Sequence, residues 1–204
     1  MPTRSTTFTL NVQIGPDFTM SASPGIVTLN RETSGSTTIS ITRSGGHNLT
    51  INLSASGVPS GTTHSFTPSS LSSTQNSSTL SFSVGSSTTP QDYTITVSGS
   101  DGYISRSTTV GLSVIDFTVS VSPTTISIPR GSSGTVTASV TGLNSHPGPV
   151  VMGISGVPSG VSVNWTPSSA TSTGITPGQS ATISLNVSLS ATTGTYTVTV
   201  SGTY

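Results

Sequence analysis

The stretch Asp17-Phe18-Thr19-Met20-Ser21-Ala22-Ser23-Pro24 decides the fold, because it occurs twice in the chain. It returns 99 residues later as Asp116-Phe117-Thr118-Val119-Ser120-Val121-Ser122-Pro123. Ser56-Gly57-Val58-Pro59-Ser60-Gly61 recurs at the same offset, starting at Ser155. In a chain of 204 residues, two copies of a unit of this size predict two domains, each large enough to bury its own core. We expect a tail at residues 1–16, domain 1 at 17–115 and domain 2 at 116–204.

Short alternating segments separated by Gly, Pro and Ser turns fill both copies. Such segments are typical of antiparallel strands, and no window has a helical period. The sequence therefore predicts an all-β protein made of two tandem immunoglobulin-like sandwiches. The expected strands lie at 18–22, 26–29, 37–42, 49–55, 63–66, 79–84, 93–97 and 107–115 in domain 1, and at 117–121, 125–128, 135–140, 150–154, 161–165, 181–189 and 196–200 in domain 2.

The composition excludes several classes of function. Charged residues are 5% of the chain and balance to zero, with arginine but no lysine, so no basic surface for nucleic acid is expected. No cysteine is present, which excludes disulfides and thiolate chemistry. No apolar run approaches the roughly 20 residues of a membrane helix, so membrane insertion is not expected. Lysine–asparagine isopeptide cross-links cannot form without lysine.

No constellation of reactive residues emerges. His47, His64 and His146 lack metal-ligand spacing and are expected on the surface. The acidic residues are scattered; Asp17 and Asp116 begin the two copies, where their side chains are expected to bond nearby backbone N–H groups. Catalysis, a metal site and a cofactor are therefore not expected. Trp165 could stack on a sugar, but its repeat partner is Phe66 and a core position is favoured.

One motif resembles a known group of modules. In each copy, Ser-Gly-Val-Pro-Ser-Gly precedes an aromatic residue followed by Thr-Pro, at Phe66-Thr67-Pro68 and Trp165-Thr166-Pro167. This pattern is similar to bacterial and archaeal immunoglobulin-like modules. The resemblance implies the fold, and it implies tandem use on surface proteins or as appendages of secreted proteases and glycosidases.

The two copies end differently. Tyr93-Thr94-Ile95-Thr96-Val97-Ser98-Gly99 matches Tyr196-Thr197-Val198-Thr199-Val200-Ser201-Gly202. The first copy then continues as Arg106-Ser107-Thr108-Thr109-Val110-Gly111-Leu112-Ser113-Val114, whereas no such strand follows in the second copy. Another version of it, Arg4-Ser5-Thr6-Thr7-Phe8-Thr9-Leu10-Asn11-Val12, precedes domain 1. We expect domain 2 to lack its last strand and the tail to provide one.

A sandwich without its last strand exposes an apolar groove and unpaired backbone groups. The expected acceptor residues are Ile126, Ile128, Tyr196, Val198 and Val200. The expected donor strand places Phe8, Leu10, Val12 and Ile14 on one face. Domain 1 separates tail and groove, and about ten residues span at most about 35 Å. We therefore expect insertion into a second copy of the chain, which repeats head to tail as an open filament.

This arrangement resembles the chaperone–usher pilins, which accept an N-terminal strand from the next subunit. The chain is similar to the archaeal thread filaments in having two domains per subunit, no cysteine and abundant Ser and Thr. The resemblance implies an extracellular appendage that serves adhesion, with copies of itself as partner. The alternative is a spacer or carbohydrate-binding module cut from a longer secreted or surface protein, in which residues 4–12 end a preceding domain.

Five Asn-x-Ser/Thr sequons also point to the cell exterior. The alternation of strand residues predicts that Asn48, Asn52, Asn164 and Asn186 face solvent on strands, and Asn76 lies in a polar loop. N-linked glycans are expected at these five positions.

Overall fold

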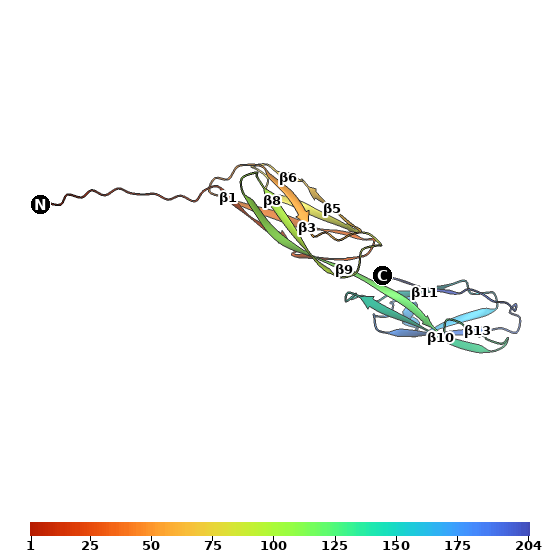
Figure 1. Ribbon diagram of the computed structural model, residues 1–204. Coiled ribbons are helices and arrows are strands. Elements are labelled where there is room, and N and C mark those ends of the chain that lie inside the picture. The colour runs from red at the N-terminus through yellow and green to blue at the C-terminus, as the bar shows by residue number, and fades with distance from the viewer. The chain divides into compact units, whose positions relative to one another are not determined.

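The computed structural model describes residues 1–204. Its regular secondary structure consists of β-strands and one 3-10 turn, η1 (Ser168–Thr171). The chain divides into two compact units, Met1–Val114 (unit 1) and Ile115–Tyr204 (unit 2). Residues 1–16 contain no strand (Figure 1). Each unit is an immunoglobulin-like antiparallel β-sandwich, as the sequence predicts.

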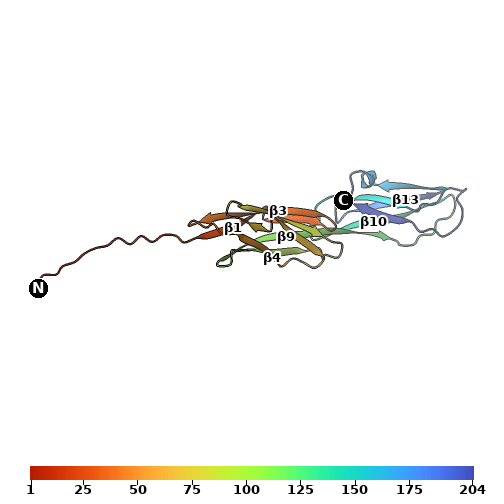
Figure 2. The ribbon, with the colours of Figure 1, turned by 90° about the horizontal axis from the view of Figure 1, so that it is seen from above.

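Unit 1 is a complete two-layer sandwich (Figure 2). One layer has the order β1-β3-β7-β5, and the other has β6-β4-β8-β9 with β2 paired to the outer side of β9. Their bounds are β1 (Asp17–Ser23), β2 (Ile26–Asn30), β3 (Ser34–Ser44), β4 (Ile51–Ser56), β5 (Thr62–Thr67), β6 (Ser70–Leu71), β7 (Ser77–Val84), β8 (Asp92–Ser100) and β9 (Ser105–Ser122). The boundary between the units falls within β9, whose residues 105–113 pair with β8.

The main core of unit 1 lies between these two layers. Alternation in β9 turns Val110, Leu112 and Val114 inward, where all three are fully buried. They pack in one cluster with Ile95 and Val97 of β8 and with residues from β2, β3 and β7. The last strand of unit 1 is therefore part of its core.

Unit 2 has fewer strands. Residues 116–122 of β9 pair with β10 (Ser133–Leu143), which continues the order to β13 (Ser180–Val187) and β12 (Val161–Thr166). The other sheet holds only β11 (Val151–Ser155) and β14 (Thr199–Thr203), paired to each other. No strand of unit 2 corresponds to residues 105–114 of β9.

One predicted strand of unit 2 is absent and another begins later than expected. Residues 125–128 form no strand, and the strand expected at 196–200 begins only at Thr199. In unit 1 the corresponding β2 and the first half of β8 both pair with β9. Because a strand requires a hydrogen-bonded neighbour, both segments lose strand geometry where that neighbour is lacking. Smaller differences occur at β4, which starts at Ile51 and not Leu49, and at β13, which ends at Val187.

Candidate functional site

An open groove of about 700 Å³ lies in unit 2. Its two rims are the segments 123–130 and 191–198. Apolar side chains from the strands form its floor: Val121, Val136, Ile154, Leu185, Val187 and Val200. The groove therefore occupies the position where unit 1 holds β9, between the counterparts of β2 and β8.

Exposure of the groove residues shows how much of the core is open. Val27 and Leu29 of β2 are buried, whereas their repeat partners Ile126 and Ile128 are 37% exposed and half-buried, respectively. Val198 and Val200 are also half-buried, although Ile95 and Val97 of unit 1 are fully buried. Tyr196 is 45% exposed. Unit 2 thus leaves unsealed the apolar surface that Val110, Leu112 and Val114 cover in unit 1.

The backbone along the groove is open as well. β8 pairs with β9 along its whole length, Asp92–Ser100, and with β4 on its other side over residues 96–100. Its counterpart β14 pairs only with β11. An edge strand of this kind presents N–H and C=O groups that an added strand can pair with. The groove therefore offers both an apolar floor and a backbone template.

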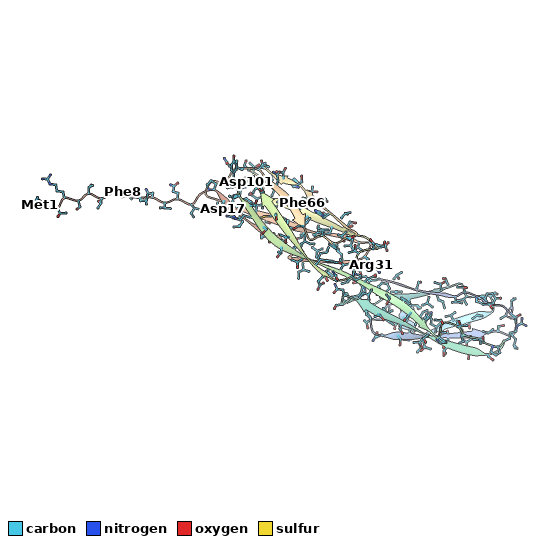
Figure 3. The ribbon with its side chains drawn as sticks, in the orientation of Figure 1. Met1, Phe8, Asp17, Arg31, Phe66 and Asp101 are labelled. Carbon is cyan, nitrogen blue, oxygen red and sulfur yellow. The ribbon has the colours of Figure 1, made fainter.

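The tail carries the side chains expected for the donor strand. Phe8, Leu10, Val12 and Ile14 are 88%, 73%, 86% and 80% exposed. Figure 3 marks Phe8 on this tail. Within the structure of one chain, these four residues and the groove are not brought together. The five predicted acceptor residues, in contrast, all line the groove: Ile126, Ile128, Tyr196, Val198 and Val200.

Except for Val200, the residues on the floor of the groove were not predicted from the sequence. Val136, Ile154 and Leu185 come from β10, β11 and β13, far from one another in the chain. The signal that could have found them is the repeat itself, because the partner of Leu185 in unit 1 is Phe82, which is fully buried. Trp165 packs partly buried against the core of unit 2, as expected.

A polar cluster closes the end of unit 1 where Asp17 and Asp101 lie (Figure 3). Arg106 Nη2 donates to Asp17 Oδ2 at 2.7 Å, and the N–H of Phe18 donates to Asp17 Oδ1 at 2.6 Å. The Arg106 hydrogen bond, followed by the Phe18 N–H, lowers the pKa of Asp17. The expected backbone bond of Asp17 is therefore present.

His47 is the buried member of this cluster. Arg43 Nη1 lies 2.7 Å from His47 Nδ1, and because a guanidinium only donates, Nδ1 is the acceptor. Nε2 therefore carries the proton and donates to Asp101 Oδ2 at 2.7 Å. The N–H groups of Ile104 and Tyr103, and then His47, lower the pKa of Asp101 to about 2.

The prediction that the histidines are on the surface is wrong for two of the three. His47 and His146 are 5% and 4% exposed, whereas His64 is exposed. His146 packs edge-on against Phe117 and Tyr204, and neither of its ring nitrogens has a hydrogen-bond partner. The aromatic contact of each buried histidine, Phe18 for His47 and Phe117 for His146, is the same in the two repeats. No cluster of three or more His, Cys, Asp or Glu residues that could hold a metal is present.

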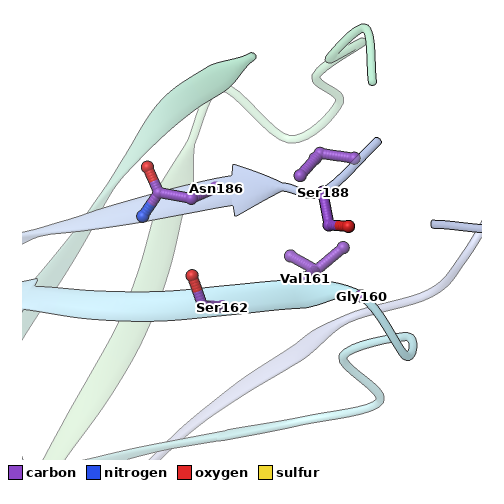
Figure 4. Close-up of a pocket in the computed structure, with 6 residues that line it drawn as sticks. Gly160, Val161, Ser162, Asn186 and Ser188 are labelled. Atoms are coloured by element: carbon purple, nitrogen blue, oxygen red, sulfur yellow. The ribbon is translucent and has the colours of Figure 1, made fainter. Parts of the chain in front are cut away.

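A second, shallow pocket lies between the ends of β12 and β13 (Figure 4). It is lined by Gly160, Val161, Ser162, Asn186, Val187 and Ser188. Asn186 is one of the five sequon asparagines, and all five are exposed. Asn52, Asn164 and Asn186 lie on strands as predicted, but Asn48 lies in the loop before β4 because that strand starts later than expected.

None of the helical structure present is long and apolar enough to cross a membrane.

Comparison with known proteins finds solved structures of low similarity and no related sequence. No family model matches the chain, and no curated protein matches it. Among solved structures, the I67–I69 fragment of the titin I-band is 14% identical to this chain and has a TM-score of 0.42. The match covers 94% of this chain, which spans 65% of the length of that fragment. Domains 4 and 5 of the S-layer protein SbsC are 12% identical, with a TM-score of 0.36, and 92% of each chain is covered. An endo-fucoidan hydrolase of glycoside hydrolase family 107 is 10% identical, with a TM-score of 0.36, covering 87% of this chain and 26% of that one.

Proposed function

We propose that this protein is the subunit of an extracellular filament, in which the N-terminal tail of one copy completes the sandwich of unit 2 in the next copy. The proposal rests on two features that occur together in one chain. Unit 2 has an open groove at the position of β9, and the tail repeats the sequence of β9. The donor residues are Phe8, Leu10, Val12 and Ile14, and their partner is a second copy of this chain.

The physical gain comes from sealing the groove. Burial of each apolar donor side chain stabilises the joint between two copies by roughly 1.5–3 kcal/mol. Backbone pairing along β14 adds roughly 0.5–1.5 kcal/mol for each hydrogen bond. Ordering the tail opposes this at about 1–2 kcal/mol per residue. Because the contact joins two different surfaces, each copy both donates and accepts a strand, and we propose that the contact repeats from copy to copy as an open filament.

Other properties support a structural role at the cell surface. Low charge and the exposed sequons Asn48, Asn52, Asn76, Asn164 and Asn186 suit a glycosylated extracellular protein. Protein from the native host should lose mass on enzymatic removal of N-linked glycans, and an unchanged mass would exclude glycosylation. Adhesion is the role we assign to the filament, because the pilins and threads that the arrangement resembles imply it.

Deletion of residues 1–14 tests the assembly mechanism. The truncated chain should remain monomeric in electron micrographs and sedimentation, while circular dichroism still reports a folded β-protein. A synthetic peptide of residues 3–14 should then bind the truncated chain and raise the unfolding temperature of unit 2. A peptide of the same composition with Phe8, Leu10 and Val12 moved to the opposite parity is the control.

The same experiment identifies the alternative function. A spacer or carbohydrate-binding module of a longer protein would be monomeric with and without the tail. Normal filaments from the truncated chain would also contradict the proposal.

A further inference from the structure

We infer that the tail enters the groove in a single register, with residues 4–12 in the places that residues 106–114 hold in unit 1. The inference rests on the proposed function and names the atoms that select one alignment among several. It also predicts an ion pair between neighbouring copies, Arg4 to Asp116.

Sequence identity supports this alignment. Six of the nine positions are identical at an offset of 102 residues: Arg4, Ser5, Thr6, Thr7, Leu10 and Val12 match Arg106, Ser107, Thr108, Thr109, Leu112 and Val114. None of their partners Ser107, Thr108 and Thr109 is buried in unit 1, so burial of apolar surface alone gives no reason for the identity of Ser5, Thr6 and Thr7. A common set of neighbouring residues, in unit 1 and in the groove of unit 2, would explain this identity.

Side-chain sizes on the outer side of the strand agree with the alignment. A Cβ atom at Gly111 would lie 3.0 Å from Cγ1 of Ile26, so the large Ile26 leaves little space there. In the filament both residues change: Gly111 is replaced by Thr9, and the repeat partner of Ile26 is the smaller Thr125. The N–H of Gly111 donates to Gly25 O at 2.9 Å, and the corresponding bond runs from Thr9 N–H to Thr124 O.

Sizes also agree on the inner side. Val110 lies opposite Ile95 in the β8–β9 ladder. Under the same alignment Phe8 lies opposite Val198, so a larger donor residue meets a smaller acceptor residue. Each of the two exchanges keeps the combined size of a contacting pair roughly constant, as close packing requires.

The ion pair follows from the cluster at the end of unit 1. Arg106 at the start of β9 bonds to Asp17, the first residue of β1. Arg4 takes the position of Arg106, and Asp116 is the repeat partner of Asp17. A charged pair at the entrance of the groove fixes the register, since a shifted strand loses it.

A shift of two residues is the main competing alignment, because it preserves the parity of the strand. It would put Leu10, Val12 and Ile14 in the places of Val110, Leu112 and Val114, and Thr6 in the place of Arg106. It would also put the longer Asn11 at the Gly111 position. In the register that we infer, Phe8, Leu10 and Val12 fill the groove, whereas Ile14, the fourth donor residue named above, lies beyond it in the place of Asp116.

Engineered cysteine pairs distinguish the registers, because the chain has no cysteine of its own. Thr94 pairs with Gly111 in unit 1, so Thr197 should lie opposite Thr9 of the next copy and diagonal to Asn11. Directly opposed residues have Cα atoms about 4.5–5.5 Å apart and diagonal ones about 7–8 Å, while a disulfide needs about 4.4–6.8 Å. The matched variants are Thr9→Cys/Thr197→Cys and Asn11→Cys/Thr197→Cys, oxidised after assembly has been checked by microscopy.

The expected result is a ladder of covalent oligomers on a non-reducing gel from Thr9→Cys/Thr197→Cys and mostly monomer from Asn11→Cys/Thr197→Cys. The reverse pattern, or filaments that cross-link in neither variant, would overturn the register but leave strand donation intact. A cross-linked species of monomer mass would show that the tail returns to its own chain, and a chain that never polymerises would overturn the proposed function itself.

Discussion

His47 and His146 occupy equivalent places in the two repeats and are both buried, but only His47 has hydrogen-bond partners. At the position of Arg43, unit 2 has Gly142. A buried imidazole without partners is costly, because its polar atoms have lost water and gained nothing. The same residue at equivalent positions should therefore stabilise unit 1, where it is His47, and destabilise unit 2, where it is His146.

Replacement of each histidine by phenylalanine should expose this difference. His146→Phe keeps the edge-on contacts to Phe117 and Tyr204 and removes two unpaired nitrogens, so the unfolding temperature should stay constant or rise. His47→Phe breaks the bonds to Arg43 and Asp101 and should lower it by several degrees. Calorimetry of the full chain measures both, and equal losses would contradict the assignment of partners.

Asp101 should give unit 1 a measurable pH dependence. Its pKa is about 2 in the folded chain, chiefly because the N–H groups of Ile104 and Tyr103 bond its carboxylate. An unfolded aspartate has a pKa of about 3.9. The stabilisation is therefore complete above about pH 4 and is lost as the pH falls through about 2.

Asp101→Asn retains an oxygen for the turn but not the charge. The unfolding temperature of this variant should lie below that of the natural chain at pH 6, and the difference should vanish near pH 2. A difference that persists unchanged at pH 2 would show that the carboxylate charge is not responsible. Asp92→Asn, at the first residue of β8, is the control for loss of one acidic group elsewhere in unit 1.

At the scale of the strand, alternation decides which face of residues 4–12 would meet the groove in the filament that we propose. Leu10→Asp places a charge against Val136, Leu185 and their neighbours and should weaken each joint by roughly 2–7 kcal/mol. Thr9→Asp changes the outer face and should stay within about 0.5 kcal/mol. Resistance of purified filaments to denaturant measures both. If the two variants were equally stable, the tail would not be filling a core.

The sequence predicts the strands that have neighbours and fails for those that do not. Residues 125–128 and 196–198 have the alternation of their partners in unit 1, but a strand also needs a hydrogen-bonded neighbour, which local pattern cannot reveal. The rim of the groove could be predicted from the repeat, whereas floor residues such as Ile154 required the assembled sandwich. Burial of His47 depends on Arg43 and on Asp101, which is 54 residues away, so its loop sequence suggested a surface position.

At the scale of the molecule, the position of the Asp17–Arg106 pair has a mechanical consequence. Asp17 begins β1, the first strand of unit 1, and bonds to Arg106 at the start of the segment of β9 that lines the core. In the filament that we propose, tension would therefore enter unit 2 at Asp116, beside Arg4, and leave through Val12 at the far end of the inserted strand. Loads applied at opposite ends of a strand act along it, so the ladder bonds share the force.

A handle on a bound peptide of residues 3–14 tests this loading geometry on the truncated chain tethered through unit 1. Pulling from the carboxyl end of the peptide shears the ladder, whereas pulling from its amino end opens the bonds one after another. Single-molecule rupture forces should be clearly higher for the carboxyl-end handle. Equal forces would show that the strand does not run along the line of pull, and unequal forces would support shear loading of the joint in the filament that we propose.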